Sequence, residues 1–389
     1  MPQINGNEEM DTAEKIHMPE ISRIPEIDLI KAVCICGMVF IHIYEQMILV
    51  GDGYTVQRIS SGSFDGIFSG VLEFCGAASS FFVICLGIGI VLSRRSTAPY
   101  LAKRGVILLL IGLALAFFTN FLPNLLGYLV LDRTMFFDRG GALGLLSNDV
   151  LIFAGLAFFF FALVKKFRIP NIAVLAIALG FLISAYFVPT DCFSDIPALQ
   201  GLFGWIYWQD WGYSFFSFAQ WIIFPVFGYL FGQFLIRQQN YPKFYLRLFL
   251  ISAAGIVIFI SLCMLSGIDI TSFYTLQNFS LYRITVLSAL WCILFFCLFL
   301  PLFYLVSKKI SGTKISSVVL KMSRNITPIY CTQWMLIVVV MSFAYDFVPI
   351  GYPAYFLISI GVLTASYLIA GKYKEIKAKR CSRRNKPSV

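Results

Sequence analysis

The hydropathy of the chain falls into ten long apolar stretches that are separated by short polar segments. An α-helix needs about twenty mostly apolar residues to cross roughly 30 Å of hydrocarbon, and most of these stretches have that length. The pattern therefore predicts an all-α fold, a polytopic membrane bundle of about ten transmembrane helices. The predicted helices cover residues 29–50, 70–92, 104–122, 148–164, 170–188, 214–236, 245–266, 284–306, 326–345 and 351–371.

Basic residues alternate between the loops. The loops after even-numbered stretches hold fifteen Lys and Arg residues, and the loops after odd-numbered stretches hold four. Because loops rich in Lys and Arg stay in the cytoplasm, the alternation predicts a multi-pass protein of the cell membrane with both termini cytoplasmic. The fifteen are Arg94, Arg95, Lys103, Arg104, Lys165, Lys166, Arg168, Arg237, Lys243, Arg247, Lys308, Lys309, Lys314, Lys321 and Arg324.

The composition agrees with a chain whose main solvent is lipid. Of 389 residues, 59% are hydrophobic and 13% are charged, and the mean hydropathy is +0.82. No polar stretch is long enough to fold as a second domain. We expect a disordered, acid-rich cytoplasmic tail at residues 1–22, one transmembrane domain at 23–371, and a basic cytoplasmic tail at 372–389.

The net charge of +10 does not indicate a nucleic-acid partner. Eight of the Lys and Arg residues lie in the segment 372–389, which holds a single acid, Glu375. A basic run directly after the last apolar stretch is typical of a cytoplasmic topology signal next to anionic lipid. The partners we expect are therefore the lipid bilayer and small molecules, and the sequence does not specify an oligomeric state.

Ionisable side chains within the apolar stretches are concentrated in the first two. Lys31, His42 and Glu45 lie in the first stretch and Glu73 lies in the second, whereas the centres of the other eight carry no charge. Charged groups are costly inside a bilayer, so each of them is a candidate functional residue. His42 stands out because the one other histidine, His17, lies in the polar N-terminal tail.

The spacing places these residues along one helix. Lys31 and His42 are eleven residues apart, about three turns, and therefore project from the same face roughly 16 Å apart. Glu45 is one turn beyond His42, close enough to orient a ring nitrogen or to take part in proton transfer. Glu73 begins the second stretch at a similar outer depth.

Each of these residues is also explained by a structural role without any catalytic function. Lys31 is equally explained as an anchor that reaches the inner interface, and His42 as a core histidine with satisfied hydrogen bonds. Glu45 and Glu73 are equally explained as hydrated residues near the outer surface.

The opening stretch, RIPEIDLIKAVCICGMVFIHIYEQM, resembles the first span of the transmembrane acyltransferase superfamily. That superfamily includes acyltransferase family 3 and the catalytic domain of heparan-alpha-glucosaminide N-acetyltransferase. Its pattern is an Asp, then a basic residue, then ten mostly apolar residues and a histidine, which Asp28, Lys31 and His42 match. Here Lys replaces the usual Arg, and a lysine does not form the paired hydrogen bonds of a guanidinium with phosphate.

Two further segments carry the resemblance. SFFVICLGIGIVLSRRSTAPYLAKRGVILLLIGLAL is similar to the second span, the basic turn and the third span of the family. MSRNITPIYCTQWMLI is similar to a late helix that often ends Tyr-x-x-His-Trp, with Tyr330, Gln333 and Trp334 at the corresponding positions. Gln333 in place of His removes a second titrating group. The opening EIDLIKAV and the short turn favour the heparan-acetyltransferase side slightly.

The resemblance implies an integral membrane acyltransferase that uses acyl-CoA, such as acetyl-CoA, as a co-substrate from the cytoplasm. It implies that the phosphates of CoA meet the basic residues at the inner helix ends, and that His42 acts as general base or acyl carrier with Glu45. The acceptor, a hydroxyl or amine of a sugar or cell-envelope glycan, would approach from outside, near Glu73. It implies no tightly bound cofactor and no metal. The residues implied in CoA binding are Lys31, Arg94, Arg95, Lys103 and Arg104. The last four are equally explained as the basic residues that cytoplasmic loops of membrane proteins commonly carry.

Alternatives remain open at this point. The long outer loop 189–213 holds Trp205, Tyr207, Trp208, Trp211 and Tyr213, which would serve either as a platform for sugar rings or as an interfacial aromatic belt. A secondary transporter or exporter is a second class of function, although no matching halves with interrupted helices are visible. A non-catalytic scaffold or sensor is a third.

Overall fold

The structure is a computed structural model, and it describes residues 23–50, 79–131, 141–210, 214–273, 282–344 and 352–384. Within these ranges the chain is helical, with one isolated β-bridge between Asn148 and Ser214. The all-α class is therefore confirmed for the described part. The tail at 1–22 and the residues at 51–78, which include Glu73, lie outside it.

Each of the ten predicted stretches contains a helix. The corresponding helices are α1 (Pro25–Val50), α4 (Ser79–Leu92), α5 (Ala98–Ala116), α8 (Val150–Lys166), α9 (Asn171–Ser184), α12 (Ile223–Leu235), α13 (Tyr241–Leu265), α14 (Val286–Ile310), α16 (Ile326–Ala344) and α17 (Tyr352–Arg384). α17 continues well past residue 371, where the last predicted span ends. Six segments of the described part are long and apolar enough to cross a membrane. The chain is therefore a multi-pass membrane protein, and the count of ten spans and the orientation stay predictions.

Short elements that the hydropathy pattern did not predict join these helices. A helix of two or three turns is too short to produce an apolar stretch of twenty residues. The polar caps that begin such helices, such as Thr313 before α15, do not change the hydropathy pattern. The additional elements are η1 (Phe117–Phe121, a π-helical turn), α6 (Leu122–Leu131), η2 (Gly141–Leu146), α10 (Pro197–Gly204), α11 (Phe218–Trp221), η3 (Ile270–Phe273) and α15 (Lys314–Arg324).

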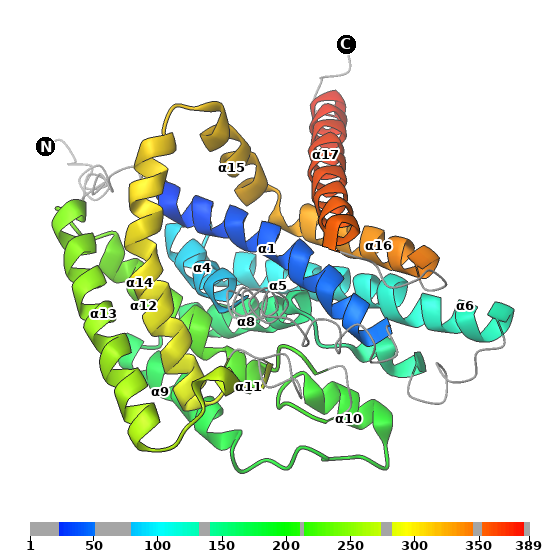
Figure 1. Cartoon of the computed structure of the whole chain (residues 1–389), viewed down its shortest axis with the longest axis horizontal. Coiled ribbons are helices and arrows are strands. Elements are labelled where there is room, and N and C mark those ends of the chain that lie inside the picture. Colours follow the sequence, from blue (N-terminus) through cyan, green and yellow to red (C-terminus); the bar gives the residue numbers. More distant parts are fainter. Residues whose placement is uncertain are drawn as a thin grey trace, which may run out of the picture.

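Helix α1 lies across the middle of the bundle and contacts α4, α14, α15, α16 and α17 (Figure 1). In its apolar window 67% of the residues are buried, against 22% in α13, which lies beside α14. The apolar side chains along α13, such as Leu250 and Ile258, are exposed. Such a surface is stable in hydrocarbon and not in water, so α1 forms the protein core and α13 a lipid-facing wall.

Helices α4 and α12 pack backbone against backbone through two glycines. A Cβ atom at Gly87 would lie 2.0 Å from the carbonyl oxygen of Pro225, and a Cβ at Gly228 would lie 2.0 Å from the carbonyl oxygen of Ile84. Small residues permit this approach, which is how helices commonly associate in membranes. The contact matters for the site because α4 is also a neighbour of α1.

The close packing predicts that Gly228→Ala destabilises the protein by about 3 kcal/mol, since an inserted methyl group must push two helices apart. Gly180→Ala is the matched control, because Gly180 is also helical and no atom lies within 4 Å of its added Cβ. Thermal unfolding in detergent measures both variants. Equal melting temperatures for the two would contradict the proposed packing.

Candidate functional site

His42 lies in the second half of α1, where that helix meets α16. Tyr330, Gln333 and Trp334 are spaced at i, i+3 and i+4 on α16 and therefore share one face of it. The Trp334 ring stacks on the imidazole, with ring centroids 4.3 Å apart and planes inclined by 29°. The Tyr330 ring meets the imidazole edge-on at 6.0 Å. The imidazole is thus held by a neighbouring helix and does not face lipid alone.

The two ring nitrogens of His42 have different surroundings. Nδ1 lies 3.4 Å from Nε2 of Gln333, a side chain with no exposed surface. Among the described residues, Nε2 of His42 has no hydrogen-bond partner, and the residue as a whole is half-buried. Within the described part of the chain, Gln333 therefore engages Nδ1 and leaves Nε2 without a hydrogen bond.

Tyr330 links this site to the start of α8. Its hydroxyl donates to the carboxylate of Asp149, and the same carboxylate accepts the backbone N–H of Val150 as the N-cap of α8. A side-chain oxygen in that position satisfies one of the N–H groups that a helix leaves unpaired at its beginning. Sequence reasoning did not single out Asp149, although an Asp directly before an apolar stretch is a helix-start signal.

The hydrogen-bond partner of Glu45 lies on a different segment from the partner of His42. Its carboxylate accepts a hydrogen bond of 2.7 Å from the hydroxyl of Tyr282, a buried residue just before α14. The Tyr282 carbonyl in turn accepts the indole N–H of Trp221 at 3.0 Å. Glu45 and His42 share the C-terminal half of α1, but the hydrogen bonds of the described residues pair His42 with Gln333 and Glu45 with Tyr282.

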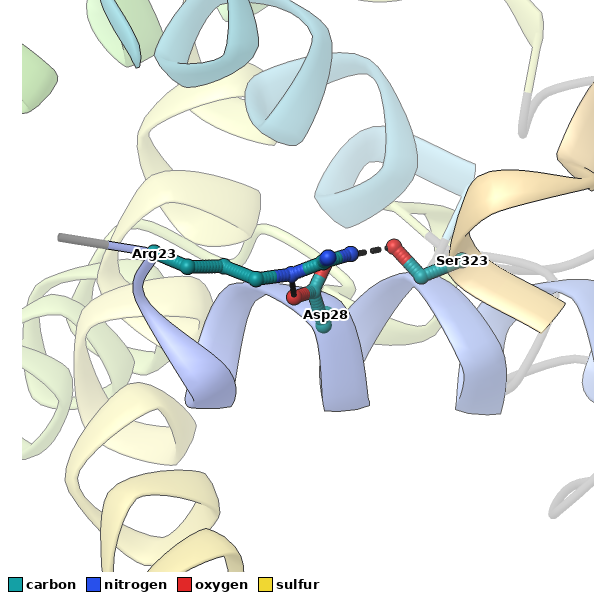
Figure 2. Close-up of polar contacts among 3 residues, drawn as sticks. All are labelled: Arg23, Asp28 and Ser323. Atoms are coloured by element: carbon teal, nitrogen blue, oxygen red, sulfur yellow. Dashed lines mark hydrogen bonds and ion pairs between the residues drawn. The ribbon is translucent and has the colours of Figure 1, made fainter. Parts of the chain in front are cut away.

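The start of α1 is fixed by two carboxylates. Asp28 accepts from the Arg23 guanidinium and from the Ser323 hydroxyl of α15 (Figure 2). Glu26, which is 3% exposed, accepts from the Tyr245 hydroxyl of α13. An unpaired carboxylate here would be strongly destabilising, so these contacts set the position of α1 against two helices.

The basic residues implied in CoA binding gather at that same end of the bundle. A Cβ placed on Gly89 of α4 would lie 3.8 Å from the Lys31 amine, so Lys31 reaches toward the end of α4. Arg94 and Arg95 follow in the exposed loop between α4 and α5. Lys103 and Arg104 are exposed on the first two turns of α5, and the Arg104 guanidinium lies 4.8 Å from the ring centroid of Phe158.

The spacing of Lys31 and His42 predicts one shared face of α1, and in the structure the two side chains meet different helices. Lys31 lies beside α4, and His42 lies beside α16. Their separation of about 16 Å along the helix follows from eleven residues at 1.5 Å each. Glu73, the remaining candidate, lies outside the described residues.

The side chains of the aromatic loop at 189–213 that the structure describes form contacts with the rest of the protein. Trp205 donates its indole N–H to a backbone carbonyl at 2.8 Å, and the Tyr207 hydroxyl lies 3.1 Å from a serine hydroxyl of α9. The Arg283 guanidinium lies 5.2 Å from the Trp208 ring centroid. These contacts favour a structural role for the three rings, and residues 211–213 lie outside the described part.

The arrangement defines a class of protein: a multi-pass membrane protein with one histidine held between helices and a basic cluster at one end of the helix that carries it. Comparison with known families is consistent with that class. The family model described as an acyltransferase domain, acyltransferase family 3, matches residues 24–371. The chain therefore belongs to acyltransferase family 3, one of the two branches named from the sequence, and the predicted superfamily is confirmed. No curated protein and no solved structure matched the chain.

The bond between Tyr330 and Asp149 predicts that Tyr330→Phe lowers the free energy of unfolding by about 1–3 kcal/mol, because it leaves a half-buried carboxylate short of a donor. Tyr373→Phe is the control, since Tyr373 lies exposed on α17. Chemical or thermal unfolding in detergent measures the difference. If both variants have the same free energy of unfolding as the unmodified protein, the hydrogen bond between Tyr330 and Asp149 does not contribute to stability.

Proposed function

We propose that this protein transfers an acetyl or other acyl group from cytoplasmic acyl-CoA to a hydroxyl or amine of an extracytoplasmic sugar or cell-envelope glycan. One observation carries the proposal: in a member of an acyltransferase family, one histidine within the membrane-spanning part has one ring nitrogen engaged by Gln333, and its other nitrogen has no hydrogen-bond partner among the described residues. Positioned imidazoles are the commonest general bases in proteins.

The chemistry requires one proton to move twice. His42 Nε2 takes the proton of the acceptor hydroxyl as the oxygen attacks the thioester carbonyl carbon. The tetrahedral intermediate then collapses, the carbon–sulfur bond breaks, and the imidazolium returns the proton to the departing thiolate. The products are the acylated acceptor and free CoA, so His42 ends the cycle neutral. The stacked Trp334 keeps the plane of the ring constant throughout.

The basic end of the bundle is the proposed entry point for the donor. Lys31, with the loop and helix-start residues Arg94, Arg95, Lys103 and Arg104, supplies positive charge for the phosphates of CoA. The distance of roughly 16 Å between Lys31 and His42 along α1 is of the same order as the extended pantetheine arm. We assign Glu73 to the acceptor side, and Glu45 to holding the outer half of α1 through Tyr282.

This proposal implies that His42→Ala loses acyl transfer. Purified protein in lipid vesicles is incubated with labelled acetyl-CoA and cell-envelope glycans, and both label on the glycan and release of CoA are measured. Loss of a general base typically lowers the rate by about 10²–10⁴-fold. His17→Ala is the matched control, because His17 lies in the polar N-terminal tail and has no part in the proposed site.

Two results would reject the assignment. The first is full transfer by His42→Ala that melts at the same temperature as the unmodified protein. The second is flux of a small molecule into vesicles without any CoA donor, which is the behaviour of a transporter. Label retained on the protein at His42 would instead identify the histidine as an acyl carrier within the same reaction.

The proposal also places both termini in the cytoplasm, with ten spans between them. A green fluorescent protein fused after Val389 in a bacterial host is expected to fluoresce, since it matures in the cytoplasm. Alkaline phosphatase fused at the same point is expected to be inactive, because it requires the oxidising periplasm. The reverse pattern would rule out this orientation and the cytoplasmic entry of CoA together.

A further inference from the structure

Gln333 is the polar group that the structure brings to Nδ1 of His42. It has no exposed surface, and its Nε2 lies 3.4 Å from the ring nitrogen. Its Oε1 is buried without a hydrogen-bond partner among the described residues. Rotation about the last side-chain bond exchanges the amide oxygen and nitrogen without moving the rest of the residue, and hydrogen-bond logic decides between the two orientations.

The two orientations give His42 opposite properties. If the amide nitrogen faces Nδ1, then Nδ1 is an acceptor and the ring proton sits on Nε2. The free nitrogen is then a hydrogen-bond donor and cannot take a proton. If the amide oxygen faces Nδ1, the ring proton sits on Nδ1 and the lone pair is on Nε2. Only the second tautomer is a base at the nitrogen that is free to meet a substrate.

We propose that Gln333 is the positioning residue of His42, and that its carbonyl oxygen accepts the Nδ1 proton. The inference rests on the proposed function, because only a base at Nε2 requires this tautomer. Trp334 fixes the plane of the ring by stacking. Gln333 fixes the rotation within that plane, because it distinguishes Nδ1 from the carbon on the opposite edge of the ring. Together they direct the Nε2 lone pair to one place.

A carboxamide suits this position better than a carboxylate would. Either group accepts the Nδ1 proton, but a carboxylate would stabilise the protonated ring and occupy the base before the substrate arrives. It would also add a charge to a site between apolar helices. Gln333 selects the tautomer without these effects, so the ring stays neutral between turnovers.

The tautomer is measured directly by ¹⁵N nuclear magnetic resonance on histidine-labelled protein in detergent or lipid discs. The sequence holds only His17 and His42, so His17→Ala leaves a single labelled ring. A proton-bearing nitrogen and a bare nitrogen resonate far apart, and their couplings to the ring protons assign them. We expect His42 to be neutral at pH 7 with the proton on Nδ1, and Gln333→Met to lose this preference.

The spectrum of the protein with Gln333 intact is decisive even if the Met variant does not fold. A proton on Nε2, an equal mixture of tautomers, or a ring protonated on both nitrogens would overturn the assignment. The measurement needs no donor or acceptor, so its result is separate from the outcome of the acyl-transfer assay. A proton on Nδ1 in a protein without transferase activity would uphold the positioning role and reject the proposed reaction.

Kinetics supply a second readout that a purely structural role would not move. Gln333→Met should lower kcat by about tenfold or more with KM little changed, since the wrong tautomer is then populated. Gln333→Glu should stay active, with the acidic limb of its pH–rate profile shifted to higher pH, because the carboxylate favours the protonated ring. Full kcat in Gln333→Met, or an unshifted profile in Gln333→Glu, contradicts the proposal.

Discussion

The need to pair the acidic side chains and the histidine of α1 is the constraint on which the rest of the structure depends. A buried polar group without water must find a partner within the protein or lose several kcal/mol. Glu26, Asp28, His42 and Glu45 each find one on a different segment, α13, α15, α16 and the loop before α14. These contacts make α1 the common partner of helices that are distant in sequence. The helix that carries the candidate chemistry is therefore also the helix that organises the bundle.

The sequence predicted the parts of the fold that depend on local composition. Ten apolar stretches predicted ten helices, and the polar residues within the first stretch identified His42. The contacts that define the surroundings of His42 join residues far apart in the sequence: Tyr330 and Asp149 are 181 positions apart, and Gln333 and His42 are 291 apart. Apolar periodicity carries no information on which helices become neighbours, so these pairs required the structure. At position 333 the sequence indicated only a glutamine where the family often has a histidine, and the contact with Nδ1 is visible only in the structure.

Family membership and geometry together separate the three classes of function. A match to acyltransferase family 3 across residues 24–371 favours an enzyme over a transporter or a scaffold. The geometry adds that Nδ1 and Nε2 of His42 are chemically distinct, which a general base requires and a packing histidine does not. The basic residues near the start of α1, in the loop after α4 and at the start of α5 are equally compatible with membrane topology and with phosphate binding. The family match and the surroundings of His42 therefore favour an enzyme, and the basic residues do not distinguish between the classes.

The central claim is that the donor reaches His42 from the end of the bundle where α1 begins. The most direct measurement is an experimental structure of the protein with a non-reactive acetyl-CoA analogue whose sulfur is replaced by a methylene group. If the donor enters there, the analogue's phosphates lie at Lys31 and the adjacent basic loop. Its carbonyl carbon lies about 4–6 Å from His42 Nε2, which leaves room for an acceptor oxygen that is hydrogen-bonded to the base and in contact with the carbon. An analogue bound elsewhere, or a His42 ring turned to lipid with no path from the basic end, would contradict it.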